Sequence, residues 1–100
     1  MTKQDIQRQL LATLKQLPYR RNIRRISLFG SHIHGKANAK SDIDLLLETK
    51  KPMSMFTLVR MERELTASMG RKVDLSTPKS LSRYFREDVL HEAQPIFEAQ

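Results

Sequence analysis

The seven residues DIDLLLE, at positions 42–48, constrain the fold of this 100-residue chain more than any other stretch. The run is short, largely apolar and free of glycine and proline, which is typical of a buried strand. Successive side chains of a strand point to opposite faces, so Asp42 and Asp44 share one face, and Leu46 follows them on it. The other face carries three apolar side chains, Ile43, Leu45 and Leu47. The stretch therefore predicts a sheet with one apolar face and two neighbouring carboxylates at one end of the other.

The residues before this strand predict a helix and a first strand. Apolar residues recur at near-helical spacing from Thr2 until Pro18 stops the run; they are Ile6, Leu10, Leu14 and Leu17. The segment NIRRISLFG, residues 22–30, predicts a strand of about six residues that runs into a tight turn at Gly30. Residues 31–41 predict a turn or short helix followed by a polar loop.

The second half of the chain predicts two more helical regions and two short strands. Ser54 can cap a long helix that ends at Gly70, with an expected buried stripe of Met55, Leu58, Val59, Leu65 and Met69. Residues 71–77 predict a short strand. Thr77-Pro78 opens a last helical region, whose expected inward side chains are Leu81, Phe85, Val89 and Leu90. Residues 95–98, PIFE, predict a short final strand. The sequence thus indicates one domain over residues 1–100, an α/β (α+β) fold with helices packed on a small mixed sheet.

A third carboxylate, Asp74, opens the predicted strand at residues 71–77. If that strand lies beside the strand of Asp42 and Asp44, the three carboxylates converge at one end of the sheet. Converging carboxylates raise one another's pKa and destabilise a fold, and a divalent cation removes that cost. Hard oxygen ligands suit Mg²⁺. Two such ions about 4 Å apart stabilise the attacking and leaving oxygens in phosphoryl or nucleotidyl transfer.

The turn after the first predicted strand can hold an anion. Gly30 allows the backbone to approach a ligand closely, and a following helix would offer free N–H groups. Ser31 adds a hydroxyl donor, and Gly35 lets the same loop return toward the carboxylates. This pattern indicates a site for the distal phosphates of a nucleoside triphosphate.

The amino-acid composition limits the classes of partner, of binding site and of cellular location that fit this chain. The formal net charge of +7 and pI near 10.2 favour a polyanion: a nucleotide, a nucleic acid or an acidic protein surface. A basic patch of Arg20, Arg21, Arg24 and Arg25 could contact RNA, or it could be a solvated strand edge that discourages aggregation. With no cysteine, disulfides and thiolate zinc sites are excluded. No apolar run reaches the length of a membrane span and the N-terminus lacks a signal-peptide core, so a cytoplasmic protein is expected.

The stretch GSHIHGKANAKSDIDLLL, residues 30–47, resembles the signature of the nucleotidyltransferase superfamily that includes DNA polymerase β. That signature has Gly-Ser, a glycine shortly after, Ser-Asp-x-Asp-Leu, and a later Asp in an apolar strand, here KVDLS. The small size and the ending LSRYFREDVLHEAQPIFE are similar to minimal nucleotidyltransferases, the MntA-type antitoxins paired with HEPN-domain toxins. One difference is His32 and His34, which stand where family members often carry arginine.

The resemblance implies a polymerase β-like fold and a set of roles. It implies that nucleotide is bound by Gly30, Ser31, Gly35 and Ser41. It implies that Asp42, Asp44 and Asp74 are the catalytic residues and the ligands of a pair of Mg²⁺ ions. It further implies transfer of AMP from ATP to a hydroxyl, a tyrosine, of a HEPN-type RNase toxin, which is thereby neutralised. The implied partner forms a stable complex, and the resemblance allows a higher-order hetero-oligomer.

Two alternative functions remain open at the level of sequence. The same fold could be a non-catalytic antitoxin that only covers a toxin surface. It could also transfer a nucleotide to RNA or to a small molecule. Small-molecule relatives usually carry an added acceptor-binding domain, and 100 residues leave little room for one.

Overall fold

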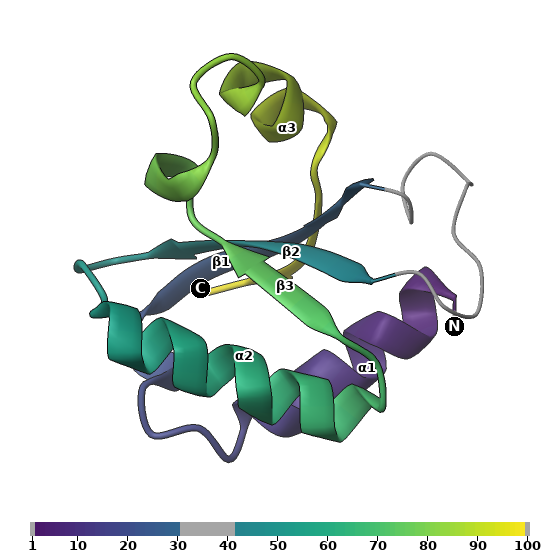
Figure 1. The fold of residues 1–100 in the computed structure, drawn as a ribbon. Coiled ribbons are helices and arrows are strands. Elements are labelled where there is room, and N and C mark those ends of the chain that lie inside the picture. Colours follow the sequence, from purple (N-terminus) through teal and green to yellow (C-terminus); the bar gives the residue numbers. More distant parts are fainter. Residues whose placement is uncertain (1, 31–41, 100) are drawn as a thin grey trace.

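A computed structural model describes residues 2–30 and 42–99 (Figure 1). The elements in chain order are α1 (Lys3–Leu14), η1 (Arg20–Asn22), β1 (Ile23–Phe29), β2 (Ile43–Thr49), α2 (Met55–Met69), β3 (Val73–Ser76), η3 (Pro78–Ser80), α3 (Arg86–Glu92) and β4 (Gln94–Glu98). The four predicted strands and the two long helices are confirmed. The predicted turn and loop at residues 31–41 lie outside the described residues.

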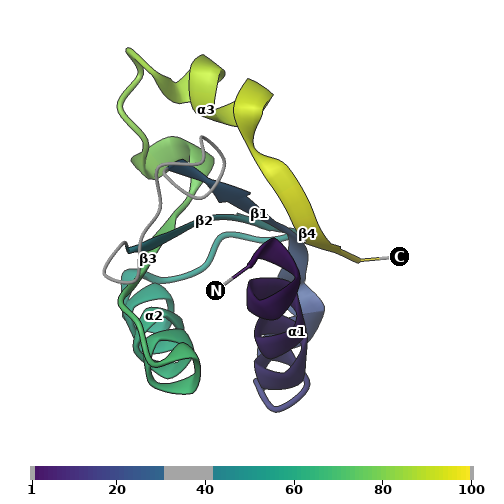
Figure 2. The same cartoon turned by 90° about the vertical axis from the view of Figure 1, so that its right-hand side faces the viewer.

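The four strands form one mixed sheet in the order β3-β2-β1-β4. β1 is antiparallel to both β2 and β4, whereas β2 and β3 are parallel. Helices α1 and α2 lie together against one face of the sheet, and α3 stands on the opposite side (Figure 2). The fold is therefore the predicted α/β (α+β) arrangement of helices on a small mixed sheet. None of the helices formed by the described residues is long and apolar enough to cross a membrane.

The apolar face of β2 forms the centre of the core. The three side chains predicted to share that face are all fully buried: Ile43, Leu45 and Leu47. Against them pack the buried stripe of α1, made of Ile6, Leu10 and Leu14, and the buried residues of α2, which are Met61, Leu65 and Met69. The apolar residues that alternate along the strand thus pack against the apolar residues that recur every 3.6 positions along the helices.

The predicted stripe of α2 was wrong at two positions. Met55 and Val59 are exposed, at 68% and 41% of their surface, and Met61 is buried instead. Val59 lies two residues before Met61, which places it about 200° away around the helix. The buried line of α2 includes Met61 and Leu65, so Val59 faces away from the sheet. Leu58 packs against the core from a partly buried position.

The last helical region also differs from the prediction. Leu81 is buried, but Phe85 and Leu90 are 50% and 42% exposed, and Val89 is half-buried. The region is divided into the short η3 and the seven-residue α3 rather than forming one helix. Because α3 stands on the side of the sheet opposite the α1–α2 layer (Figure 2), its apolar residues are not enclosed between helices and sheet.

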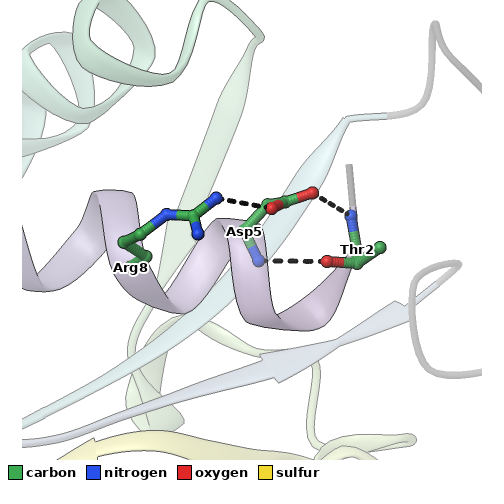
Figure 3. A network of polar contacts seen from close by, with 3 residues as sticks. All are labelled: Thr2, Asp5 and Arg8. Atoms are coloured by element: carbon green, nitrogen blue, oxygen red, sulfur yellow. Dashed lines mark hydrogen bonds and ion pairs between the residues drawn. The ribbon is translucent and has the colours of Figure 1, made fainter.

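The first helix begins with reciprocal hydrogen bonds (Figure 3). The Asp5 backbone N–H donates to the Thr2 hydroxyl at 3.1 Å, and the Thr2 backbone N–H donates to the Asp5 carboxylate at 3.0 Å. Arg8 pairs with the same carboxylate at 2.7 Å. The hydrogen bonds from Thr2, and then the charge of Arg8, hold the pKa of Asp5 below its ordinary value. This capping box satisfies N–H groups that have no partner within the helix.

Thr2→Ala should lower the free energy of unfolding by about 1 kcal/mol, because it removes the capping acceptor of α1. Equilibrium urea denaturation measures the change. Thr2→Ser, which keeps the hydroxyl, is the matched control and should stay close to wild type. Equal stability of Thr2→Ala and wild type would show that the cap is not formed in solution.

Candidate active site

The parallel pairing of β2 and β3 brings three carboxylates to one end of the sheet. Asp44 is opposite Asp74 in the register, and the Ile43 N–H donates to the Lys72 carbonyl at 2.9 Å. Asp42 precedes β2 and interacts with both Asp44 and Asp74. The strand of Asp74 therefore lies beside the strand of Asp44, as the predicted convergence of the three carboxylates required.

The carboxylates are crowded enough to disturb their titration. Burial, and then the charges of Asp74 and Asp42, raise the pKa of Asp44. The pKa of Asp74 is also raised, first by burial and then by a hydrogen bond with Asp42 and by the charges of Asp42 and Glu62, while Lys72 acts in the opposite direction. Burial and the neighbouring carboxylates together therefore disfavour the ionised forms of Asp44 and Asp74.

Lys72 is a neighbour of the cluster that the sequence reasoning missed. Its Nζ lies 3.9 Å from Asp42 Oδ2 and 3.8 Å from Asp74 Oδ1. The Lys72 side chain is 68% exposed, so each pair is a weak, solvent-screened interaction. Lys72 stands two residues before Asp74, and the period of a strand places both on one face. That spacing was the signal that could have identified it.

Asp44 and Asp74 line an open pocket with a volume of about 420 Å³. The carboxylate of Glu62, on α2, also borders the pocket. Three serine residues and several apolar side chains complete the lining; they are Ser76, Ser80, Ser82, Phe29, Leu75, Leu81 and Phe85. The pocket thus combines two aspartates suited to a cation, Asp44 and Asp74, with hydroxyl groups for polar ligand atoms and an aromatic surface.

Gly30 is required at the end of β1 by the position of Asp44. Its φ of +76° lies in the left-handed region, and a Cβ at this position would lie 2.3 Å from Asp44 Oδ2. The sequence predicted that Gly30 would let the backbone approach the phosphates of a nucleotide closely, and this stays a prediction. In the structure the neighbouring group is the Asp44 carboxylate. The predicted nucleotide-binding residues Ser31, Gly35 and Ser41 lie outside the described residues, as do His32 and His34.

The donor chemistry of the cluster fits a magnesium ion, although its conformation does not form a complete set of ligands. Within residues 2–30 and 42–99, no three His, Cys, Asp or Glu side chains are arranged to hold one metal ion. Asp42 and Asp74 instead face Lys72 and each other. Carboxylate oxygens are nevertheless the ligands that Mg²⁺ prefers, and a cation would relieve the mutual repulsion that adds to burial in raising the pKa of Asp44 and Asp74.

Comparison with known proteins assigns this arrangement to a family. Residues 9–100 match the family described as polymerase beta, nucleotidyltransferase. The chain belongs to the polymerase beta nucleotidyltransferase family. It is therefore a nucleotidyltransferase by family, as the Gly-Ser and Asp-x-Asp pattern predicted.

This nucleotidyltransferase matches curated relatives over almost their whole length. It is 34% identical to the protein adenylyltransferase MntA of Thermococcus cleftensis, over 92% of this chain and 93% of that protein. It is 31% identical to a Methanocaldococcus jannaschii protein assigned as a protein adenylyltransferase, over 96% of this chain and 99% of that protein. These matches confirm the predicted likeness to MntA-type minimal nucleotidyltransferases.

Solved structures confirm the fold. A protein assigned as a minimal nucleotidyltransferase superposes with a TM-score of 0.77 at 30% identity, over 95% of this chain and 96% of that one. A toxin–antitoxin structure with AMP-PNP superposes with a TM-score of 0.76 at 21% identity, over 94% of this chain and 74% of that one. The toxin–antitoxin MntA–HepT structure gives 0.71 at 19% identity, over 98% and 74%.

Gly30→Ala should abolish nucleotidyl transfer, because the added methyl group displaces the Asp44 carboxylate. Gly70→Ala is a matched control: Gly70 has a φ of +67° and nothing within 4 Å of its Cβ position. Each substitution carries a backbone cost of about 1–2 kcal/mol for a left-handed alanine. Transfer rates and urea denaturation of both variants separate the two effects. Equal activity of the two variants would contradict the contact between Gly30 and Asp44.

Asp44→Asn should make the nucleotide-free protein more stable at pH 7. The pKa of Asp44 in the folded protein is raised above the unfolded value of 3.8, so ionisation above the folded pKa costs stability that the asparagine does not lose. The advantage should shrink as pH falls through the folded pKa and disappear below 3.8, where the carboxyl is protonated in both states.

Urea denaturation at several pH values measures this difference. Asp88→Asn, which changes an exposed carboxylate in the first turn of α3, is the control and should bring no gain. A destabilised Asp44→Asn protein at pH 7 would show that burial and neighbouring charges do not disfavour the ionised carboxylate.

Proposed function

We propose that this nucleotidyltransferase transfers AMP from Mg-ATP to a hydroxyl group of a partner protein, a tyrosine of a HEPN-domain toxin, and so neutralises the toxin. The observation that carries this proposal is the convergence of Asp42, Asp44 and Asp74 at the β2–β3 junction, directly beside Gly30. The family of the chain and the names of its relatives, which are protein adenylyltransferases, support the same chemistry.

In the proposed reaction the acceptor oxygen attacks the α-phosphorus of ATP, and the bond to the β-phosphate bridging oxygen breaks to release pyrophosphate. Asp42 and Asp44 would hold the Mg²⁺ ions, and Asp74 would hold one of them and accept the proton from the acceptor hydroxyl. When bound, the ions would supply positive charge for the attacking and leaving oxygens. Gly30 keeps the space that the Asp44 carboxylate needs, and Ser31, Gly35 and Ser41 are proposed to bind the phosphates.

A protein acceptor is supported by the surface around the pocket. Phe85 lines the pocket and is half exposed, and Tyr84, its neighbour, is 83% exposed. Leu90, on α3, is a third exposed apolar side chain of the same region. Exposed apolar patches mark protein or membrane interaction sites as well as ligand-binding grooves, so these side chains are compatible with a protein acceptor. Among the structural neighbours is a tri-AMPylated Shewanella oneidensis HEPN toxin in complex with its MNT antitoxin.

The arginine patch gives less support to RNA as the acceptor. Arg25 lies between Glu48 and Glu98, with each distance 3.7 Å, and Arg20 donates to the Lys15 carbonyl. Half of the four arginines therefore have partners within the protein. The same exposed apolar surface also fits the alternative of a non-catalytic antitoxin that covers the toxin, and the experiment below separates the two.

The test is intact-mass spectrometry of the protein encoded by the adjacent gene, incubated with this chain and Mg-ATP. The control is the Asp42→Asn/Asp44→Asn double variant, which should lose transfer while staying folded. We expect a mass gain of one or more AMP units on the partner that disappears in the control. A stable, inhibited but unmodified partner would replace the enzymatic proposal with simple masking.

A further inference from the structure

The strand that carries Asp74 lies at the edge of the sheet, and α2 supplies hydrogen-bond partners along it. The Val73 N–H donates to the Thr66 hydroxyl at 3.0 Å, and the Leu75 N–H donates to Glu62 Oε2 at 2.8 Å. N–H groups of alternate residues in a strand point to the same side, so these two point away from β2 together. An edge strand otherwise leaves such groups unpaired.

The two acceptors are spaced to match the strand. Glu62 and Thr66 are four residues apart on α2, which places them on one side of the helix. Asp74 stands between the two residues whose N–H groups they bind. On its other side, β3 is held by parallel pairing with β2, where Asp74 is opposite Asp44. The backbone of Asp74 is thus fixed from both edges of its strand.

The negative charge of Glu62 is electrostatically unfavourable next to the aspartates of the pocket. It is only partly exposed, it lines the same pocket as Asp44 and Asp74, and its charge raises the pKa of Asp74. A fourth carboxylate beside three others is unfavourable unless it makes a specific contact. The bond from the Leu75 N–H is such a contact, because hydrogen bonds to an ionised acceptor are short and strong.

We propose that Glu62 is a positioning residue: by accepting the Leu75 N–H, it holds the edge strand so that the Asp74 carboxylate stands opposite Asp44. This role rests on the proposed function, in which Asp74 takes part in nucleotidyl transfer. Glu62 acts through the backbone of β3 and not by touching the reacting atoms.

Two substitutions with the same charge change test the role. Glu62→Ala removes the acceptor, whereas Glu62→Gln keeps an amide oxygen that can accept from the Leu75 N–H. For Glu62→Ala we expect amide hydrogen exchange at Leu75, measured by NMR in the nucleotide-free protein, to become about tenfold faster. We also expect kcat to fall about tenfold or more with the KM for Mg-ATP unchanged. Glu62→Gln should stay near wild type in exchange and in kcat.

Glu64 offers a matched control on the same helix. Its carboxylate accepts from the Tyr19 hydroxyl and pairs with Arg60, away from β3. Glu64→Ala and Glu64→Gln therefore make the same chemical changes without touching the edge strand. Both should leave Leu75 exchange and kcat unchanged, which excludes a general effect of α2 stability or of charge.

Two outcomes would overturn the proposal. Wild-type exchange and kcat in Glu62→Ala would show that the contact does not position the strand. Loss of transfer in Glu62→Gln, with Leu75 still protected, would show that the charge itself acts in the reaction.

Mn²⁺ affinity, measured by electron paramagnetic resonance, tests the role of Glu62 without relying on AMP transfer. Glu62→Ala should bind Mn²⁺ more weakly than Glu62→Gln, since only the alanine releases Asp74. If wild type transfers no AMP, the proposed function fails, while Leu75 exchange and Mn²⁺ affinity still decide the role of Glu62. Equal Mn²⁺ affinity of the two variants would count against it.

Discussion

The parallel pairing of β2 with β3 is the constraint on which the rest of the structure depends. It places Asp44 opposite Asp74 and brings like charges together. Burial of the apolar face of β2 opposes that repulsion: Ile43, Leu45 and Leu47 are fully buried, and each contributes about 1.5–3 kcal/mol. The core therefore stabilises a charge arrangement that the acidic residues alone would not adopt.

One face of the sheet forms the hydrophobic core, and the other borders the acidic pocket. Helices α1 and α2 cover one face and form the core with it, whereas α3 stands on the other side (Figure 2). Leu81 and Phe85, which precede α3, border the acidic pocket. Under the proposed function, a partner that brings a hydroxyl group to Asp74 would approach the pocket from the α3 side, past the half-exposed ring of Phe85.

Features that depend on local backbone geometry could be predicted from the sequence. The alternation of Asp42, Ile43 and Asp44 fixes which side chains enter the core in any sheet, and the structure agrees. Side-chain exposure was harder, because it depends on what lies opposite. Val59 and Phe85 are apolar, but the face of α2 that carries Val59 and the outer side of α3 are not covered within the described part of the chain.

Features that depend on contacts between distant segments of the chain could not be predicted from the sequence. Glu62 meets Leu75 across 13 positions of the chain, and nothing in the charged run of α2 distinguishes it from Glu64. The sequence predicted a tight turn at Gly30 and a role in phosphate binding, but the nearby oxygen of Asp44 appears only when β1 and β2 are paired. The catalytic roles of the three aspartates follow from the family resemblance and await the experiments above.

The alternation in β2 also protects the fold against its own misassembly. A strand that slips by one residue turns every side chain to the opposite face of the sheet. Here such a slip would drive Asp42 and Asp44 into the layer packed by α1 and α2, and would turn Ile43 and Leu45 toward the acidic pocket. Burying two unpaired carboxylates is far costlier than exposing apolar surface. The aspartates therefore disfavour a shifted register of β2, and the same residues that form the acidic site also help to specify the alignment of the strand that carries them.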